Sequence, residues 1–179
     1  TISKELEEDK KLKNKIKIIT NDVVYKLIEE TAIYRKEKLK EIEKKRLMEL
    51  STIAKIEILP NYVFRNANPA IFGVKVLAGR IKPNLTLIDN KDEKIGRIKN
   101  VQSENKSVEE ASEDMEVAVS IPGINFERHL KNTKHLYSEL TEKSFKNFKK
   151  NKDLLTQKEI LLLQELMDIK RGKNPVWGN

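Results

Sequence analysis

The sequence predicts a small antiparallel β-barrel or sandwich, preceded by one long helix and followed by short C-terminal helices. Residues 23–50 contain no glycine and no proline, so nothing in this stretch interrupts a helix. Short apolar runs rich in β-branched residues then recur at regular spacing from residue 53 to residue 137. Turn residues separate these runs, which is typical of small all-β folds. Helix-capping signals return after residue 138.

The first 50 residues are dominated by charge. Residues 3–15 are nearly all charged, and residues 16–19 alternate as a short strand does. Thr20, Asn21 and Asp22 supply N-cap chemistry for the helix that follows, which would be roughly 42 Å long. Two apolar stripes on this helix need something to dock on: Val24, Leu27, Ile28 and Ala32 near its start, and Leu47, Met48 and Leu50 near its end.

The middle of this helix is too polar to contribute to a core. Residues 35–46 include 10 charged residues in 12, with only Leu39 and Ile42 apolar. This pattern predicts a free-standing linker helix held by ion pairs at i,i+4 spacing. A coiled coil is the alternative, but two apolar residues make too thin a seam.

The central segment predicts the strands. Short β-rich runs occupy residues 56–59, 70–77, 85–88, 94–101 and 115–121. They end at Pro60, at Gly79, at the turn 89–92 and at Pro122, all of which are strand-terminating or turn-forming signals.

The last 40 residues predict helices. Thr141 caps a short helix that carries Phe145 and Phe148, and Thr156 with Glu159 forms a capping box that opens a helix to Arg171. Gly172 is the expected C-cap of this second helix. It carries more apolar residues than one face of a lone helix needs, so we expect it to pack on the first helix or on a partner. These residues are Ile160, Leu161, Leu163, Leu166, Met167 and Ile169.

Charge favours a polyanionic partner. The 179 residues carry a net charge of +8, with net charges of +3 over residues 1–50, zero over 51–130 and +5 over 131–179. Residues 51–100 are basic (9 against 4) and residues 101–130 acidic (2 against 7). Nucleic acid is the first candidate partner and an acidic protein tail the second. A compositional bias toward lysine is the alternative explanation.

Several classes of function find no support in the sequence. There is no cysteine, which excludes disulfides, thiolate-bound zinc and thiol nucleophiles. The apolar runs are too short to span a membrane, so we expect a soluble, cytoplasmic chain. No phosphate-binding P-loop is present, and residues 90–93 (Asn-Lys-Asp-Glu) differ at their last position from a guanine-reading motif, so they predict an ordinary turn. His129, expected in a loop, and His135, expected in a strand, share no metal-binding face. We predict no catalytic or metal site in this chain.

The segment from residue 55 to residue 79 carries a resemblance to a known family. It reads K-I-E-I-L-P-N-Y-V-F-R-N-A-N-P-A-I-F-G-V-K-V-L-A-G, and it closely resembles the opening of domain IV of archaeal and eukaryotic translation initiation factor 5B. Four further stretches resemble the family in the same order, at residues 21–27, 96–102, 126–129 and 174–178. The resemblance therefore covers about residues 16–179.

The resemblance implies a division into four parts and a role in translation. Residues 1–20 would end domain III, 21–51 would form the linker helix, 52–138 a barrel like domain 2 of elongation factor Tu, and 139–179 the C-terminal helices. The factor is implied to be a ribosome-dependent GTPase that promotes joining of the small and large ribosomal subunits. Its GTP and Mg²⁺ would lie in a G domain that this chain lacks, so no cofactor is expected here. The linker helix is expected to act as a lever between the domains.

The resemblance also implies where partners bind. The barrel would hold the aminoacyl acceptor end of initiator Met-tRNA, as the related barrel of bacterial initiation factor 2 does, through three places. These correspond to Val74, to the stretch 102–106 with Ser103, Glu104 and Lys106 as candidate contacts, and to the start of the strand at 116–118 with Glu116 and Ala118. This chain departs from the bacterial pattern, since Val74 replaces a cysteine and only Lys106 is basic in its stretch. The bacterial formyl-methionine pocket is therefore not expected to be present as a whole.

Residue types add further candidates. Phe64, Arg65, Asn66 and Asn68 are expected in one loop and offer stacking, charge and amide groups to RNA, with Arg80 and Lys82 after the next strand and Arg97 and Lys99 after another. The C-terminal helices are implied to dock the tail of initiation factor 1A. The candidate contacts there are Phe145, Phe148, Leu161, Leu163, Leu166, Lys170, Arg171 and Trp177. Two alternatives stay open: a stand-alone basic RNA-binding or ribosome-associated protein, and a pure protein-interaction module.

Overall fold

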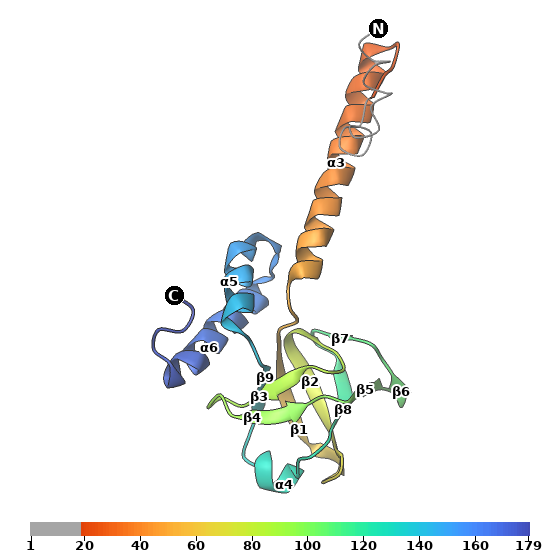
Figure 1. Ribbon diagram of the computed structural model, residues 1–179. Coiled ribbons are helices and arrows are strands. Elements are labelled where there is room, and N and C mark those ends of the chain that lie inside the picture. Colours follow the sequence, from red (N-terminus) through yellow and green to blue (C-terminus); the bar gives the residue numbers. More distant parts are fainter. Residues whose placement is uncertain (1–18) are drawn as a thin grey trace. The chain divides into compact units, whose positions relative to one another are not determined.

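The computed structural model describes residues 19–179 (Figure 1). The chain forms two compact units, residues 1–47 and residues 48–179, which we describe separately. The predicted strand at 16–19 and the assignment of residues 1–20 to the end of a preceding domain lie almost entirely outside the described residues.

Helix α3 (Val24–Glu49) confirms the predicted long helix. The side chain of Asn21 accepts a hydrogen bond from the backbone N–H of Val23 (3.1 Å), which is the predicted N-terminal capping chemistry. The helix is polar along its length, and Lys38 and Glu41 form an ion pair at i,i+3 (2.6 Å). Val24 and Ile28, in the first apolar stripe, are exposed.

The second unit is built on a nine-stranded antiparallel sheet in the order β4-β3-β9-β1-β2-β8-β5-β6, with β7 paired to β2. The strands are β1 (Ala54–Arg65), β2 (Ala70–Ile81), β3 (Thr86–Ile88), β4 (Lys94–Arg97), β5 (Asn100–Ser103), β6 (Lys106–Ser107), β7 (Ala111–Ser112), β8 (Glu116–Ile121) and β9 (His135–Ser138).

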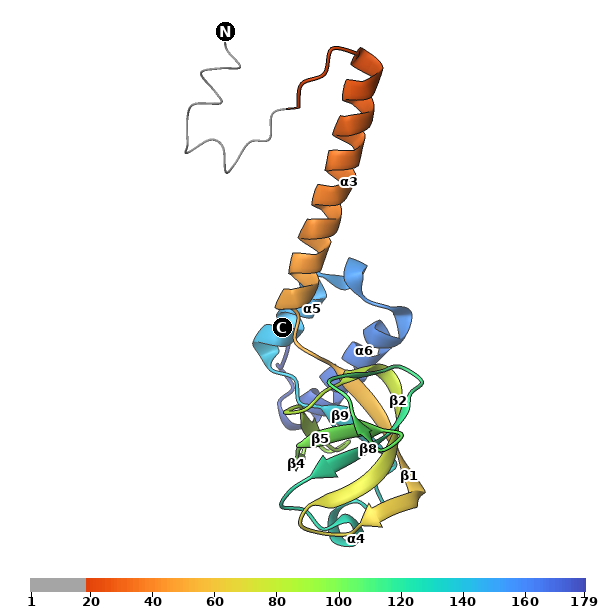
Figure 2. The ribbon, with the colours of Figure 1, turned by 90° about the vertical axis from the view of Figure 1, so that its right-hand side faces the viewer.

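The sheet curls into the predicted barrel. Strand β4 lies at one end of the hydrogen-bonded order and β5 is next to last at the other end. The two strands follow each other in the chain, so this connection brings the two sides of the sheet together. Gly96 on β4 packs against Ile121 on β8, where an added Cβ would approach the isoleucine Cγ2 to 2.7 Å. The views in Figures 1 and 2 show the strands wrapping around a common interior. The single predicted strand at 94–101 is thus two strands, because the chain turns at residues 98–99 to cross this edge.

Apolar side chains from strands β1, β2, β5, β8 and β9 meet inside the barrel. The core includes Ile56, Phe72, Val74, Val101, Val119 and Leu136, each with no exposed surface. Helix α4 (Phe126–His129) closes one end of the barrel, where the rings of Phe126 and Phe72 lie 5.1 Å apart. His129 therefore ends a short helix rather than lying in the expected loop, and its Nδ1 lies 2.9 Å from the carbonyl oxygen of Asn125.

Helices follow β9 as predicted. Thr141 caps α5 (Glu142–Lys150), and η1 (Lys152–Leu154) leads to α6 (Gln157–Lys173), which opens with the Thr156–Glu159 capping box. The predicted end of α6 is wrong by two residues. Gly172 lies inside the helix and Asn174 is the C-cap, whose backbone N–H donates to the carbonyl of Lys170. No helix in residues 19–179 is both long and apolar enough to cross a membrane.

A second hydrophobic core joins the C-terminal helices to the barrel. Barrel residues Ile53, Ala78, Ile88 and Tyr137 pack with tail residues Leu140, Phe145, Phe148, Leu162, Leu163, Leu166 and Trp177. Charged contacts surround this core. The Lys55 Nζ donates to both carboxylate oxygens of Glu165 (2.8 and 2.7 Å), and the Lys170 Nζ lies 2.5 Å from the Asp92 Oδ1. Barrel and C-terminal helices are therefore one folded body.

Candidate functional site

A groove of about 500 Å³ opens on the outer surface of the barrel, and we call it the barrel groove. It runs over strands β1, β2 and β8 and ends at the β5–β6 turn. Its lining consists of Leu59, Tyr62, Phe64, Ile71, Gly73, Gln102, Glu104, Asn105, Glu116, Val117 and Ala118. Residues from four separate stretches of the sequence therefore meet in one concave site.

The floor of the groove is low because two small residues face each other on neighbouring strands. Gly73 pairs with Ala118 in the β2–β8 ladder, and Ala118 pairs with Gln102 in the β8–β5 ladder. A Cβ at position 73 would lie 2.8 Å from the Cβ of Tyr62. Glycine at this position thus lets the tyrosine lie directly against β2 and form a wall of the groove.

Two aromatic side chains stand at one side of the groove. Tyr62 is 56% exposed and Phe64 is 65% exposed, although both belong to strand β1. The register of the β1–β2 ladder shifts between Ile58 and Val63, which places Val63 against the core and turns its two neighbours outward. The irregularity of β1 is therefore what delivers aromatic surface to the site.

Two carboxylates line the groove at its other side and end. Glu104 and Asn105 form the two-residue turn between β5 and β6, with φ angles of +49° and +64° that fit a type I′ hairpin. Glu116 is the first residue of β8. Both glutamates are exposed, and no lysine or arginine lines the groove.

A smaller hollow of about 200 Å³ adjoins the groove and shares Ile71, Gln102 and Ala118 with it. This side hollow also contains Lys99, whose backbone N–H donates to the carbonyl of Ser120 (2.7 Å). No acidic residue lines the side hollow. The combined surface is thus acidic in the groove and basic in the side hollow.

The structure brings together some of the predicted tRNA contacts. Phe64, Glu104, Glu116 and Ala118 all line the groove. Phe64 and Arg65 lie at the end of β1, not in the expected loop, because β1 continues to residue 65. Ser103, which precedes Glu104, is half-buried and pairs with the exposed Lys106 across the β5–β6 hairpin.

Other predicted contacts lie elsewhere. Val74 has no exposed surface, because its side chain points into the barrel core, so it cannot touch a ligand in the groove. Arg80 lies within β2, which extends to residue 81, and pairs with Glu110 at 3.2 Å. Lys82 is exposed just beyond the end of β2. Asn66 follows β1, and its side-chain Nδ2 donates a hydrogen bond to Glu127 (3.1 Å).

Several lining residues were not among the predicted contacts. Tyr62, Gln102 and Asn105 belong to the groove, and Gly73 forms its floor. Their signal in the sequence was position. Tyr62 lies two residues before Phe64, and Gln102 and Asn105 lie within the stretch 102–106 that the resemblance indicates. Which of these neighbours faces outward depends on the β1 irregularity and on the hairpin turn.

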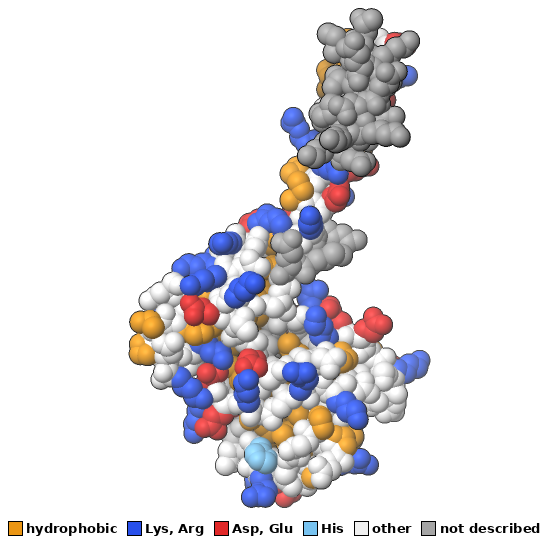
Figure 3. All heavy atoms as spheres, in the orientation of Figure 1, with side chains coloured by type: hydrophobic (Ala, Val, Ile, Leu, Met, Phe, Trp, Pro, Cys, Tyr) orange, Lys and Arg blue, Asp and Glu red, His pale blue; other side chains and the backbone are white. Residues whose placement is uncertain are grey.

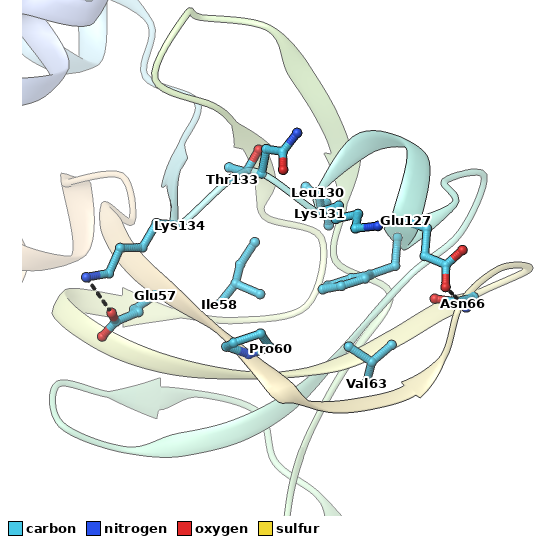
Figure 4. A pocket seen from close by; sticks show the side chains of 12 residues that line it. Glu57, Ile58, Pro60, Val63, Asn66, Glu127, Leu130, Lys131, Thr133 and Lys134 are labelled. Atoms are coloured by element: carbon cyan, nitrogen blue, oxygen red, sulfur yellow. Dashed lines mark hydrogen bonds and ion pairs between the residues drawn. The ribbon is translucent and has the colours of Figure 1, made fainter.

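A second cavity, of about 780 Å³, lies between β1 and the segment 126–134 (Figure 4). Ile58, Pro60, Val63 and Leu130 form its apolar lining. Polar pairs stand at its margins: Lys134 lies 3.4 Å from Glu57, and Asn66 bonds Glu127. Hydrophobic side chains come to the surface of the barrel near α4 in the space-filling view (Figure 3). Of the predicted contacts only Asn66 lines this cavity.

The candidate partner contacts of the C-terminal helices are mostly interior. Phe145, Phe148, Leu163, Leu166 and Trp177 are buried in the second core, because α5, α6 and the chain end pack on one another and on the barrel. The rings of Phe145 and Trp177 lie 4.9 Å apart. These five side chains hold the helices together and are not available to a partner in this fold.

The three other candidate partner contacts reach the surface to different degrees. Leu161 is 58% exposed on α6. Lys170 is engaged by Asp92, and Arg171 donates from Nε to the carbonyl of Trp177 (3.0 Å) and from a terminal nitrogen to the Asn179 side chain (2.9 Å). Arg171 therefore fastens the chain end onto α6.

Burial shifts the pKa of two side chains on strand β9, Tyr137 and His135. Burial raises the pKa of Tyr137 to about 12, with a further contribution from the negative charge and hydrogen bond of Glu165. Burial also lowers the pKa of His135, and the positive charge of Lys55 adds to this effect. Among residues 19–179 no cluster of three or more His, Asp or Glu side chains is arranged to hold a metal ion.

Comparison with known proteins gives one consistent answer. Residues 52–137 match the family model described as elongation factor Tu domain 4. The chain is 38% identical over 168 residues to a probable translation initiation factor IF-2 of Metallosphaera sedula, covering 92% of this chain and 28% of that protein. It is 39% identical over 176 residues to the corresponding protein of Hyperthermus butylicus, covering 97% and 29%.

A solved structure extends the likeness to three dimensions. The crystal structure of GDP-bound aIF5B from Aeropyrum pernix superposes with a TM-score of 0.72 at 33% identity, over 99% of this chain and 29% of that one. This chain is a relative of the IF-2/aIF5B translation initiation factors. It corresponds to the C-terminal part of such a factor, and it spans just over a quarter of the length of the relatives it matches.

The charge of the second unit is divided between two surfaces. The exposed surface of α5 carries Lys143, Lys146, Lys149 and Lys150, and only Lys146 has an acidic partner on the helix, Glu142 (2.9 Å). This basic surface lies on the C-terminal helices, whereas the barrel groove is acidic. The IF-2/aIF5B-like chain thus presents two surfaces of opposite charge within one folded body.

Proposed function

We propose that this chain is the part of a translation initiation factor that binds the aminoacyl acceptor end of initiator Met-tRNA in the barrel groove. The observation that carries the proposal is the groove itself, which gathers Phe64, Glu104, Glu116 and Ala118 beside the exposed ring of Tyr62. In the full factor, binding of this end would contribute to joining of the ribosomal subunits.

The surface chemistry of the groove suits a single-stranded RNA end that bears an amino acid. Proteins read unpaired RNA ends by stacking bases on aromatic rings and by contacting phosphates with basic side chains. Tyr62 and Phe64 supply stacking surface, and Lys99 supplies a cation in the side hollow. The small floor residues Gly73 and Ala118 leave room for an amino-acid side chain.

Titration of the chain with initiator tRNA tests this proposal. At fixed salt, methionylated tRNA should bind more tightly than the same tRNA without its amino acid. Phe64→Ala should weaken binding of the methionylated form by about tenfold, because stacking of one base on an aromatic ring is worth about 1–3 kcal/mol. Leu161→Ala, an exposed apolar change on α6, is the matched control and should leave this affinity unchanged. Equal affinity for charged and uncharged tRNA would contradict the proposal.

We further propose that the C-terminal helices bind the acidic tail of initiation factor 1A. The exposed lysines of α5 and the exposed Leu161 of α6 support this, because they combine positive charge with apolar surface on neighbouring helices. Here the control is reversed: Leu161→Ala should weaken binding of factor 1A, and Phe64→Ala should not. Unchanged affinity for factor 1A in Leu161→Ala would reject this residue as a contact.

A further inference from the structure

We infer that the cavity between β1 and residues 126–134, which we call the α4 cavity, is a docking site for a short extended peptide whose aliphatic side chains are flanked by carboxylates. Its volume of about 780 Å³ lies within the range of ligand-binding pockets. It shares no lining residue with the barrel groove or the side hollow. The inference is therefore independent of the RNA end proposed for the groove, and it concerns a protein partner.

Strand β1 separates the α4 cavity from the barrel groove. Ile58, Pro60 and Val63 line the cavity, whereas residues that alternate with them line the groove. Successive side chains of a strand point to opposite faces, so one strand forms a wall of both sites. Across the cavity, Leu130 and Thr133 of the segment after α4 face β1 (Figure 4). The cavity thus has two walls, residues 57–66 and residues 126–134.

The cavity is open because β9 leaves β1 at Ile58. The last hydrogen bond between them runs from the Ile58 N–H to the carbonyl of Lys134 (2.9 Å). Two residues on, the same side of β1 is occupied by Pro60, which has no N–H to donate. The next backbone bond on this side is at Asn66, whose carbonyl accepts from the N–H of Phe126 (2.8 Å). Among the described residues no strand pairs with β1 between these two bonds, so the backbone of an extended peptide has room to lie there.

The unpaired charge around the α4 cavity is positive. Its two walls carry four basic and two acidic side chains. Each of the two glutamates already has a partner in the opposite wall, Lys134 for Glu57 and Asn66 for Glu127. Lys131 lines the cavity and is exposed, and it has no ion-pair partner within the part of the chain that the structure describes. An occupant with a carboxylate beside Lys131 would complement this charge.

The apolar lining favours a peptide over RNA. Its accessible part is aliphatic, from the exposed Pro60 and the half-buried Val63. Phe126 is the one aromatic side chain among the lining residues, and it is only 7% exposed because its ring packs on Phe72 at 5.1 Å. Unpaired RNA bases bind by stacking on accessible aromatic rings, which this lining does not offer. Aliphatic peptide side chains suit it better, with the carboxylates of the peptide at the rim.

The test uses the whole chain and a synthetic peptide, Glu-Glu-Leu-Ser-Leu-Glu-Glu, in which one leucine is the photoreactive analogue photo-leucine. Leucines two positions apart lie on the same side of an extended chain. After irradiation at fixed low salt, mass spectrometry should find crosslinks to residues 58–66 and 126–134, with a yield that saturates as peptide is added. Replacement of the other leucine by serine should weaken this apparent affinity about fivefold, because less apolar surface is buried.

Two lysine variants test the charge of the rim. Lys131→Glu should weaken the apparent affinity at the cavity about three- to tenfold, because attraction of a carboxylate becomes repulsion. Lys91→Glu, at another exposed lysine in the β3–β4 turn and outside the cavity, is the matched control and should change it less than twofold. Because both side chains are exposed, both variants should keep the urea midpoint of the unmodified protein.

The outcomes are distinct. Saturable crosslinks to the two walls that are weakened by Lys131→Glu, and not by Lys91→Glu, support the inference. Crosslinks found only elsewhere, equal losses in the two lysine variants, or no loss when the leucine is replaced would overturn it. If single-stranded hexauridine displaces the peptide from these walls and binds there more tightly, the cavity is an RNA site and the inference is also overturned. None of these outcomes bears on tRNA binding in the barrel groove.

Discussion

Replacement of Leu166 by alanine tests whether the C-terminal helices are fastened to the barrel by their own apolar residues. Leu166 has no exposed surface and belongs to the core shared by α6, α5 and the barrel. Truncation of a fully buried leucine costs about 2–5 kcal/mol, because apolar transfer energy is lost and a cavity is left. Leu161 lies on the same helix but is 58% exposed, so Leu161→Ala should change the free energy of unfolding by less than about 0.5 kcal/mol.

Urea unfolding followed by tryptophan fluorescence measures both variants. The chain has one tryptophan, Trp177, whose side chain is buried in this core, so its emission reports on unfolding of the second unit. The midpoint should fall clearly for Leu166→Ala and stay close to that of the unmodified protein for Leu161→Ala. A loss below about 0.5 kcal/mol for Leu166→Ala, or equal losses for both variants, would refute the assignment of Leu166 to the intramolecular core.

Three further results are expected. Gly73→Ala places a Cβ 2.8 Å from the Cβ of Tyr62, so it should displace this wall of the groove and weaken binding of methionylated tRNA about fivefold or more. Uncharged tRNA should lose less affinity, because it has no amino acid to place on the groove floor, and titration of both forms checks this. Asp92→Asn leaves the largely buried Lys170 ammonium without its carboxylate and should lower the free energy of unfolding by about 2 kcal/mol in the same urea assay. Lys94→Met removes the exposed partner of Glu139 and should lower it by less than about 1 kcal/mol. The pKa of Tyr137 is raised to about 12 in the folded chain, so stability should be complete below pH 10 and decline as the pH rises from 10 towards 12; a flat stability profile over that range would contradict this.

Local rules explain which helices the sequence predicted well. Helix α3 follows from a stretch without glycine or proline after the Asn21 cap, and α5 and α6 follow from the Thr141 and Thr156 caps. These signals act between residues at most four apart, so they need no knowledge of the rest of the chain. The same reasoning misplaced the end of α6, because nothing in the local sequence around Gly172 shows that the helix continues to residue 173.

The barrel groove depends on distant pairing that no local rule supplies. Continuation of the alternation from Ile56 and Ile58 would point Tyr62 and Phe64 inward. The register shift between Ile58 and Val63 reverses this, so both rings face outward and Val63 packs against the core. Pairing of β2 with β8 likewise decides that Gly73 lies at the surface and Val74 in the core.

The sequence by itself determined the long helix, the β-rich central segment and the C-terminal helices, the absence of cysteine chemistry and the resemblance to initiation factor 5B, because these depend on residue identity and on short-range spacing. Only the tertiary structure decided which apolar side chains of the C-terminal helices are interior. A helix with apolar residues on more than one face has several ways to pack, and contacts with Tyr137, Ile53 and the returning Trp177 select one of them. The tertiary structure also separated the net charge of +8 into an acidic groove on the barrel and a basic surface on α5, because charges distant in sequence become neighbours only when the strands and helices assemble.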